Sequence, residues 1–351
     1  MEVIAGIYQA GEEVRLEFAP DPRTAIFELG VHREDGELVV YGASSSPAAV
    51  EALHARIGAL GPGVRVRDAI VRLPDGLAGA PHAIVAAATA PMLAGPVISE
   101  SHLSQIPLGN RLRVLREQGR WCQCRSADGY LGWVHRGYVE RVEESQARAW
   151  EAGTSAPVHY CLEGRVLAPD GEVLVRLPWG ARIGVTGDTA HLPDGRRGRL
   201  EGSTVAVSEM PDRFPLEGEA IAETASLWCG APYLWGGTTV WGVDCSGLVQ
   251  TIYRMHGLEL PRDSDQQAAL GEAVSHGGPF ESLQAGDLLF FAEGEDPISH
   301  VAISLGGSRI IHSSLGNGGV RTNDVAGAAG YERELRDLLV TVRRVIRGRG
   351  S

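Results

Sequence analysis

The segment WGVDCSGLVQTIYRMHGL at 241–258 places a cysteine where an apolar, helix-like pattern begins. Its apolar residues recur at intervals of three and four, which predicts an α-helix with one buried face. That face carries Cys245, Leu248, Val249, Ile252, Tyr253 and His256. Asp244 is a favoured N-cap residue and Gly257 a favoured residue just beyond a helix, so the two mark its ends. The pattern therefore predicts that Cys245 lies in the first turn of the helix.

Cys245, at the start of a helix, could serve as a nucleophile. The N-terminal end of a helix favours an anion, so we expect it to lower the pKa of the Cys245 thiol. Backbone N–H groups at a helix start can also stabilise an oxyanion, and Gly242 and Gly247 leave room for close backbone approach. A core position is nevertheless the commoner place for any one cysteine. The nucleophile hypothesis therefore needs a base elsewhere in the chain.

Two histidines in the segment DPISHVAISLGGSRIIHSS are candidates for that base. The segment predicts a β-hairpin with strands 300–305 and 309–313. The three-residue turn between the strands puts His300 and His312 on one face of the sheet, nearly opposite each other. One histidine can then act as the base while the other orients it. The alternatives are a metal pair or two solvated histidines, but the hairpin lacks a third ligand for a metal.

The size and charge of the chain argue against several classes of protein. Its 351 residues exceed one typical domain, so about two to four domains are expected. The formal net charge of −12 argues against nucleic acid or an anionic membrane as a partner. No apolar run reaches the roughly 20 residues that span a bilayer. The N-terminus lacks the basic and apolar regions of a signal peptide, so a cytoplasmic location is expected unless a leader has been removed.

The five cysteines do not predict a disulfide framework, because their number is odd and a cytoplasmic location is expected. Cys122 and Cys124 alternate along a strand-like segment, so both side chains face one side of the strand. A metal site there would need further ligands, and no second cysteine pair follows. We therefore interpret both as core residues, and Cys229 likewise.

The chain divides into four predicted domains, and its fold class is α+β. Residues 1–82 are interpreted as a small α/β module with the order β-β-α-β, and residues 83–145 as a small barrel of short strands. Residues 146–210 are interpreted as a second, poorer copy of that barrel. Residues 213–351 combine helices, glycine-rich loops and strands, and this last domain carries the chemistry.

The last domain contains, in order, the motifs PYLWGG, DCSGLVQ, LPRDSDQQ, LQAGDLLFF and HVAISLG followed by RIIHSS. Together these motifs resemble the NlpC/P60 family of papain-like cysteine peptidases. The resemblance implies that Cys245 is the nucleophile, that His300 is the base and that His312 orients it. It also implies that Tyr233, in PYLWGG, contributes to the oxyanion hole. The segment RWCQCRSADGYLGWVHRGYVE, in the first barrel, resembles a bacterial SH3 (SH3b) domain.

The motif PRDS at 261–264 resembles a subgroup of the family that combines SH3b domains with the peptidase domain and cleaves γ-D-glutamyl bonds. In that subgroup the aspartate, here Asp263, binds the free amine of an N-terminal L-Ala. Arg262 is a candidate partner for a substrate carboxylate, and Ser246 and Ser264 are candidate polar residues of the cleft. A helix cap at Asp263 or Ser264 is the alternative.

The same resemblance implies a role for the SH3b domain. This domain would close one end of the cleft and restrict substrates to short peptides with a free N-terminus. Tyr130, in DGYLGW, and Glu100 would then touch the first residue of the substrate. An ordinary barrel surface is the alternative for both residues.

The resemblance and the residues together lead to one hypothesis, a γ-D-glutamyl-L-diamino acid endopeptidase. It would cut murein-derived peptides of the form L-Ala-γ-D-Glu-diamino acid, without a metal or another cofactor, during recycling of such peptides in the cytoplasm. Two other functions stay open, a thiol acyltransferase or amidase on the same scaffold and a non-catalytic cell-wall-binding protein. The combination of PRDS with SH3b argues against the first, and the intact set Cys245, His300 and His312 argues against the second. The preferred diamino acid and the oligomeric state are left open.

Overall fold

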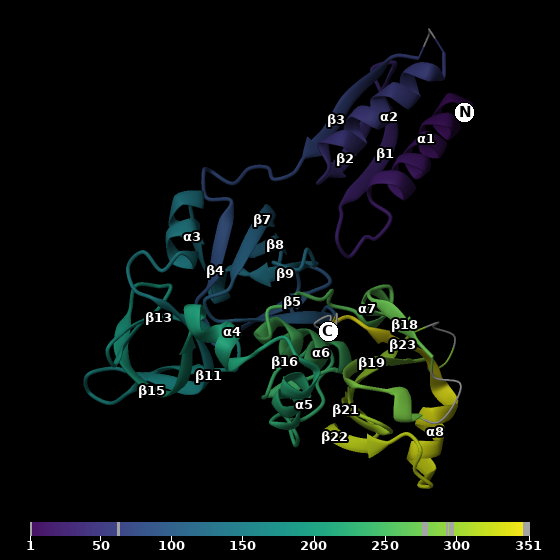
Figure 1. Cartoon of the computed structure of the whole chain (residues 1–351). Coiled ribbons are helices and arrows are strands. Elements are labelled where there is room, and N and C mark those ends of the chain that lie inside the picture. The colour runs from purple at the N-terminus through teal and green to yellow at the C-terminus, as the bar shows by residue number, and fades with distance from the viewer. Residues whose placement is uncertain (1, 62–63, 276–279, 293, 295–297, 347–351) are drawn as a thin grey trace.

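The computed structural model describes residues 2–61, 64–275, 280–292, 294 and 298–346. In Figure 1 the first barrel lies at the centre, and the N-terminal module, the second barrel and the C-terminal domain lie around it. The first barrel is therefore placed to contact every other domain.

None of the described helices is long and apolar enough to cross a membrane.

The N-terminal module begins with a helix, α1 (Glu2–Phe18), so the expected order β-β-α-β is corrected to α-β-β-α-β. The other elements are β1 (Phe27–Glu34), β2 (Glu37–Ser44), α2 (Pro47–Ala59) and β3 (Val66–Arg72). β2 pairs antiparallel with β1 and parallel with β3. α1 buries Ile7, Ala10 and Val14 in the core that it shares with α2. These positions recur at three and four residues, so one face of α1 packs beside α2 on the sheet (Figure 1).

The first barrel is built from a seven-stranded sheet with the order β10-β4-β7-β8-β9-β5-β6. A 3₁₀ turn occupies Arg136–Tyr138, and the strands are β4 (His82–Val85), β5 (Thr89–Leu93), β6 (His102–Pro107), β7 (Arg111–Gln118), β8 (Trp121–Arg125), β9 (Leu131–His135) and β10 (Val139–Val142). Cys122 and Cys124 lie on β8, and both are buried in the barrel core, as the sequence predicts.

The second barrel follows the helix α3 (Glu144–Glu151). Its strands are β11 (Val158–Leu167), β12 (Val173–Leu177), β13 (Arg182–Thr186), β14 (Thr189–His191) and β15 (Arg197–Ala206). β11 pairs with β13 and also with β15, and β14 joins β13 to β15, so four strands close on themselves. The closed sheet agrees with the expected barrel. The finer assignment of residues 146–210 as an SH3b-like copy stays a prediction.

The C-terminal domain is built on a six-stranded antiparallel sheet with the order β18-β23-β19-β20-β21-β22. Its strands are β18 (Glu272–Val274), β19 (Ala285–Phe291), β20 (His300–Leu305), β21 (Arg309–Ser314), β22 (Gly319–Asp324) and β23 (Leu339–Arg344). Its helices are α4 (Met210–Arg213), α5 (Gly218–Ser226), α6 (Cys245–Met255), α7 (Ser264–Ala268) and α8 (Gly330–Leu338). The short strands β16 (Thr238–Thr239) and β17 (Gly242–Val243) pair just before α6, and 3₁₀ turns occupy Val207–Glu209 and Phe280–Ser282.

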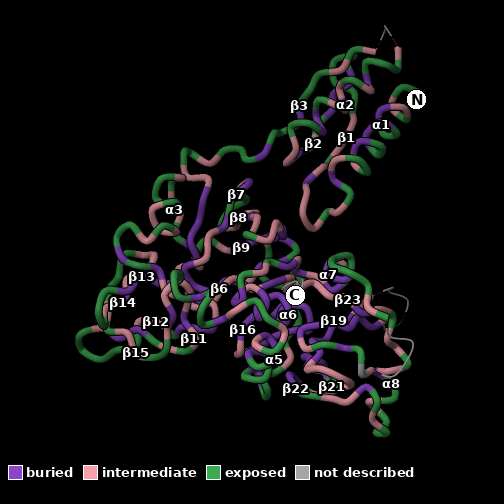
Figure 2. The backbone as a smooth tube through the Cα atoms, viewed as in Figure 1, coloured by how far each residue is buried: buried purple, intermediate pink, exposed green. Residues whose placement is uncertain are grey.

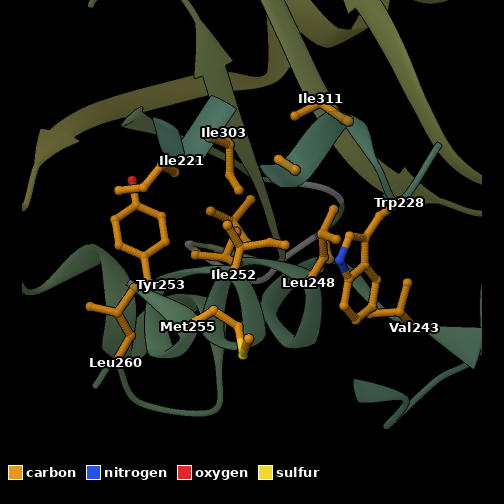
Figure 3. Packing of buried hydrophobic residues seen from close by; sticks show 14 of the residues in the cluster. Ile221, Trp228, Val243, Leu248, Ile252, Tyr253, Met255, Leu260, Ile303 and Ile311 are labelled. Atoms are coloured by element: carbon orange, nitrogen blue, oxygen red, sulfur yellow. The ribbon is translucent and has the colours of Figure 1, made fainter. Parts of the chain in front are cut away.

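Both faces of this sheet are buried. Successive residues of a strand point to opposite faces, so neighbouring residues enter different cores. Phe290 packs in the core that contains α5 and α6, whereas Phe291 packs in the core that contains α8. Figure 3 shows Leu248 and Ile252 of α6 pointing toward the strand residue Ile303. In Figure 2 the tube is coloured as buried along α6 and β19. The predicted apolar face of α6 is therefore the face that packs on the sheet.

Candidate active site

Asp244 caps α6, as the sequence predicts. Its Oδ1 accepts a hydrogen bond from Gly247 N at 2.7 Å, and its Oδ2 accepts one from Gly236 N at 2.8 Å. The first bond satisfies a free N–H group of the first helical turn, and the second ties the helix start to the loop before β16. Cys245 follows with 8% of its surface exposed. The candidate nucleophile is therefore nearly buried at the N-terminus of α6.

Gly247 allows that loop to approach the helix. A Cβ atom at residue 247 would lie 2.1 Å from the carbonyl oxygen of Gly237, far inside van der Waals contact. A Cβ atom at Gly242 would lie 2.7 Å from the side chain of Leu234. The expected close approach is confirmed at both glycines, and at Gly247 the approaching atom belongs to the backbone, which cannot move aside as a side chain can.

Arg262 is buried in a hydrogen-bond network at the start of α6. Its Nη1 and Nη2 donate to the two carboxylate oxygens of Asp244 at 3.1 and 2.6 Å. Nη1 also donates to Ser246 Oγ at 2.8 Å, and Nε donates to Ser104 Oγ of the first barrel at 3.0 Å. The Arg262 side chain is 1% exposed. We therefore correct the expectation that Arg262 binds a substrate carboxylate and that Ser246 lines the cleft, because both side chains are engaged within the protein.

The Cys245 thiol is protonated at neutral pH. Burial and the neighbouring Asp244 carboxylate raise its pKa to about 12, and hydrogen bonds from the backbone N–H groups of Val301 and Ser246 offset this only in part. Desolvation of a thiolate here outweighs the favourable end of the helix. The expected lowering of the pKa is therefore corrected, and Cys245 needs a base to take its proton. The bond from Val301 also places the sulfur beside the start of β20.

His300 and His312 are in contact on one face of the sheet, as the hairpin pattern predicts. Nε2 of His300 lies 2.6 Å from Nδ1 of His312, and the ring centroids are 4.9 Å apart. Ile303 pairs with Ile311, and this register sets His312 against Ala302 rather than His300. The two histidines are therefore diagonal neighbours, two residues apart in register, which corrects the expectation that they lie nearly opposite each other.

Both imidazoles are neutral at neutral pH. Burial, and then the neighbouring His312, lower the pKa of His300 to about 3. Burial likewise lowers the pKa of His312 to about 4, although its hydrogen bond with Asn323 acts in the opposite direction. The resting site therefore contains a protonated thiol and a neutral base. An ion pair of thiolate and imidazolium is disfavoured because both groups are desolvated.

Asn323 determines which nitrogen of each histidine carries the proton. Its Oδ1 lies 3.0 Å from Nε2 of His312, and an amide oxygen only accepts, so that nitrogen is protonated. Nδ1 of His312 must then accept the proton on Nε2 of His300, which leaves a lone pair on Nδ1 of His300. Asn317 Nδ2 lies 3.1 Å from the same Nε2 and donates to Asn323 Oδ1 at 2.7 Å, which fixes that oxygen in place.

Sequence reasoning missed Asn323 and the aromatic ring that covers His312. Tyr331 of α8 stacks on His312, with an interplanar angle of 18° and a centroid distance of 6.2 Å. His312 pairs with Arg321 across β21 and β22, so Asn323 follows two residues later on the same face. The sequence does show an amide residue on the strand after His312. Whether that residue faces His312 depends on the register of the two strands, which the turn between them sets.

Replacing Asn323 tests this proton arrangement. We expect Asn323→Leu to lower kcat for the peptide cleavage that the sequence predicts by about 10²-fold with little change in KM, because His312 loses the acceptor that sets its tautomer. Asn323→Asp is the matched control, since it keeps an oxygen at Nε2 and should retain most of the activity. Steady-state kinetics of both variants measures this. Equal losses in the two variants would contradict a role in setting the tautomer.

Tyr233 lies in the loop that packs beside the start of α6. Its N–H donates to Gly318 O at 3.3 Å, and its backbone forms a bridge with Val243, the residue before Asp244. Its side chain is half-buried. The backbone around Tyr233 is thus tied both to β17 and to the turn before β22, while its part in an oxyanion hole stays a prediction.

Tyr130 of the first barrel reaches Asp263 of the C-terminal domain. Its hydroxyl donates to Asp263 Oδ2 at 2.9 Å. The turn that carries Tyr130 is docked on α6, because Gln250 Nε2 donates to Asp128 Oδ2 at 2.7 Å. Asp263 precedes α7 without a side-chain capping bond, so capping does not occupy its carboxylate. The two side chains therefore lie together at the domain interface, and their contact with a substrate stays a prediction.

Ser264 and Glu100 lie in different environments. Ser264 is buried as the first residue of α7. Glu100 is exposed in the turn between β5 and β6, where its side chain packs over Gly95. Among the residues that the structure describes, no hydrogen bond joins Glu100 to Tyr130 or Asp263. Roles for Ser264 and Glu100 in substrate binding stay predictions.

Comparison with known families confirms the expected resemblance. Residues 230–338 match the NlpC/P60 family, and residues 89–140 match the bacterial SH3 domain. The first match contains the Cys245 helix and the hairpin of His300 and His312. The second contains the turn with Tyr130, so the two matched regions meet at Asp263.

Individual proteins and structures show the same likeness. The chain is 28% identical over 225 residues to a γ-D-glutamyl-L-lysine dipeptidyl-peptidase of Bacillus subtilis, covering 60% of this chain and 71% of that protein. It is 25% identical over 268 residues to dipeptidyl-peptidase 6 of Lysinibacillus sphaericus, covering 70% and 92%. The crystal structure of an NlpC/P60 family protein from Bacillus cereus matches 76% of this chain and 100% of that chain, with 22% identity and a TM-score of 0.63. This last likeness concerns the fold alone.

Proposed function

We propose that this chain, whose C-terminal domain belongs to the NlpC/P60 family, is a cysteine endopeptidase that cuts the bond between γ-D-Glu and a diamino acid in cell-wall peptides. The observation that carries the proposal is the contact of His300 with His312 beside Cys245, whose sulfur accepts a hydrogen bond from the backbone N–H of Val301, the residue after His300. The relatives named as γ-D-glutamyl-L-lysine dipeptidyl-peptidases support the choice of bond.

The proposed reaction begins with a proton transfer from the Cys245 thiol to Nδ1 of His300. The sulfur attacks the γ-carbonyl carbon of D-Glu as the proton leaves, which forms a tetrahedral oxyanion. The N–H of Cys245 at the helix start, together with Tyr233, would stabilise that oxyanion. His300 then gives the proton to the departing amine of the diamino acid, and water, deprotonated by His300, hydrolyses the thioester. Nδ1 of His300 thus accepts a proton and returns it both when the thioester forms and when water hydrolyses it.

The proposed substrate carries a free N-terminal L-Ala, whose ammonium group would bind Asp263. A carboxylate in a partly desolvated place pairs well with an ammonium ion, and a blocked amine would leave the charge unpaired. Tyr130 and the first barrel would limit the length of peptide beyond that amine. Peptides of this kind are produced when the cell wall is degraded, so recycling of murein peptides in the cytoplasm is the proposed setting.

One pair of peptides tests the proposal. The protein is incubated with L-Ala-γ-D-Glu-meso-diaminopimelate and with its N-acetylated twin, and products are identified by mass spectrometry. We expect L-Ala-D-Glu and free diaminopimelate from the first peptide, and at least about 10²-fold slower cleavage of the second, because acetylation removes the charge that pairs with Asp263. Equal cleavage of both peptides would remove the amine subsite from the proposal.

The same experiment separates the peptidase from the other two functions. A thiol acyltransferase would transfer the dipeptide to an added amine and release less free L-Ala-D-Glu, so the assay is repeated with an acceptor amine. A non-catalytic binding protein would leave both peptides intact. Intact peptides at micromolar enzyme after overnight incubation would contradict the proposed function.

A further inference from the structure

The loop between α1 and β1 brings Arg23 of the N-terminal module to Asp263. Nη1 of Arg23 donates to Asp263 Oδ2 at 2.9 Å and to Asp265 Oδ1 at 2.8 Å. Nη2 donates to Asp265 Oδ2 at 2.8 Å and to Asp21 Oδ2 at 2.8 Å. One guanidinium therefore joins carboxylates from the N-terminal module and from the C-terminal domain. In Figure 1 this loop extends from the N-terminal module toward α7.

The loop is held from both sides, so the position of Arg23 is well determined. The carbonyl oxygen of Arg23 accepts a hydrogen bond from Leu131 N of the first barrel at 2.7 Å. Gln266 of α7 donates to Asp21 Oδ2 at 2.7 Å. Arg116 of the first barrel donates to both carboxylate oxygens of Glu28 on β1. A buried apolar cluster spans the same interface, formed by Ile26, Ala43, Leu73, Leu115 and Leu131.

The two carboxylate oxygens of Asp263 differ in their hydrogen bonds, because Oδ2 has two donors and Oδ1 has no side-chain donor among the described residues. Oδ2 accepts from Arg23 and from the Tyr130 hydroxyl, both at 2.9 Å. Among the residues that the structure describes, no side chain donates to Oδ1, and the Asp263 side chain is 26% exposed. Two donors at Oδ2 fix the rotation of the carboxylate. The exposed fraction leaves Oδ1 as the acceptor that a small cationic group can reach.

The charges around Asp263 favour a second cation beside Arg23. The carboxylates of Asp21, Asp263 and Asp265 face one guanidinium, an excess of two negative charges when all three are ionised. Arg262, the other cation nearby, is already paired with Asp244. Hydrogen bonds to Asp265 and Asp21 raise the pKa of Arg23, so it remains charged. An incoming ammonium ion therefore does not need to displace Arg23.

Arg23 also opposes the protonation of Asp263. Burial raises the pKa of this carboxyl, while Arg262, Tyr130 and Arg23 each act to lower it. Without Arg23 the carboxyl would take up a proton at higher pH, and a protonated carboxyl binds ammonium poorly.

We infer that Arg23 is a positioning residue of the amine subsite, so that the N-terminal module completes the substrate specificity of the peptidase. The inference rests on the proposed function, because it concerns the ammonium group of that substrate. Arg23 fixes Asp263 through Oδ2 and leaves Oδ1 for the N-terminal ammonium of the peptide. The N-terminal module thereby contributes to the substrate specificity of the peptidase.

Kinetics of Arg23→Ala on the free and N-acetylated tripeptides tests the inference. We expect KM for the free peptide to rise about 10-fold with kcat nearly unchanged, and the preference for the free over the acetylated peptide to fall by a similar factor. We also expect the acid side of the kcat/KM profile for the free peptide to move to higher pH, because Asp263 loses a neighbouring cation. Arg23→Lys should restore part of the preference by restoring the charge.

The controls separate positioning from folding and from the proposed function. Arg33→Ala removes an exposed arginine of the same module and should leave the preference unchanged. The melting temperature of each variant reports whether the module stays docked. Unchanged preference and pH profile in Arg23→Ala, or higher activity on the free peptide, would overturn the inference while the peptidase stands. If the unmodified protein cleaves neither peptide, the proposed function fails and the inference falls with it.

Discussion

Cys245→Ala is expected to reduce cleavage of the free tripeptide by about 10⁴-fold or more, to the background rate. The variant loses the sulfur that forms the thioester, while alanine fits the nearly buried first turn of α6 without a clash. His300→Ala should cause a loss of similar size, because the thiol is protonated at rest and nothing then removes its proton. Peptide cleavage followed by mass spectrometry measures both, with circular dichroism to confirm folding.

Cys229 provides the matched control for this experiment. Cys229 is exposed, which corrects its expected core position, and it lies outside the network around Asp244, so Cys229→Ala should keep full activity. A thiol-alkylating reagent should still inactivate that variant, because Cys245 remains. Full activity of folded Cys245→Ala or of folded His300→Ala would rule out the mechanism.

Arg262→Ala is expected to lower the free energy of unfolding by about 3–5 kcal/mol, the range for breaking a buried ion pair by removal of one partner. The change leaves the Asp244 carboxylate buried without its cation, and the Oγ atoms of Ser246 and Ser104 without their donor. Urea unfolding at neutral pH measures the loss. Activity should fall as well, because Asp244 caps the helix that carries Cys245.

An exposed arginine serves as the control for that measurement. Arg176 lies exposed on β12 of the second barrel, and Arg176→Ala should change the unfolding free energy by less than about 0.5 kcal/mol. Equal stability of Arg262→Ala and Arg176→Ala would contradict the structural role of Arg262. Rescue of Arg262→Ala activity by added guanidinium ion, without a change in KM, would support it.

The candidate site combines residues of three domains, and only some of its contacts depend on how these domains dock. Cys245, His300 and His312 come from the C-terminal domain alone. Asp263, by contrast, meets Tyr130 of the first barrel and Arg23 of the N-terminal module. The proposed bond-breaking groups are therefore local to one domain, while the proposed amine subsite exists only when the other domains dock.

Local patterns in the sequence predicted the elements that carry the proposed chemistry. α6 begins after Asp244, and Gly257 follows the helix with a φ of +81°, as the capping residues indicate. The hairpin of His300 and His312 could be predicted because its strands are joined by three residues and alternate regularly. Each of these features is decided by residues that lie close together in the sequence. The helix α1 was missed although its buried residues recur at three and four positions, because Gly6 and Gly11 interrupt the pattern.

The sequence by itself determined the helix that begins at Cys245 and the histidine pair, because short-range periodicity and capping specify them, and its motifs carried the resemblance of the last domain to the NlpC/P60 family. Only the tertiary structure decided the state of these groups. Packing of β20 on α6 desolvates the thiol and raises its pKa, against the effect expected of a helix end. Contacts over long sequence separations, 158 residues for Arg262 with Ser104 and 240 for Arg23 with Asp263, decided which charges are buried and which remain for a substrate. Such pairings depend on how domains dock, and no local pattern records that.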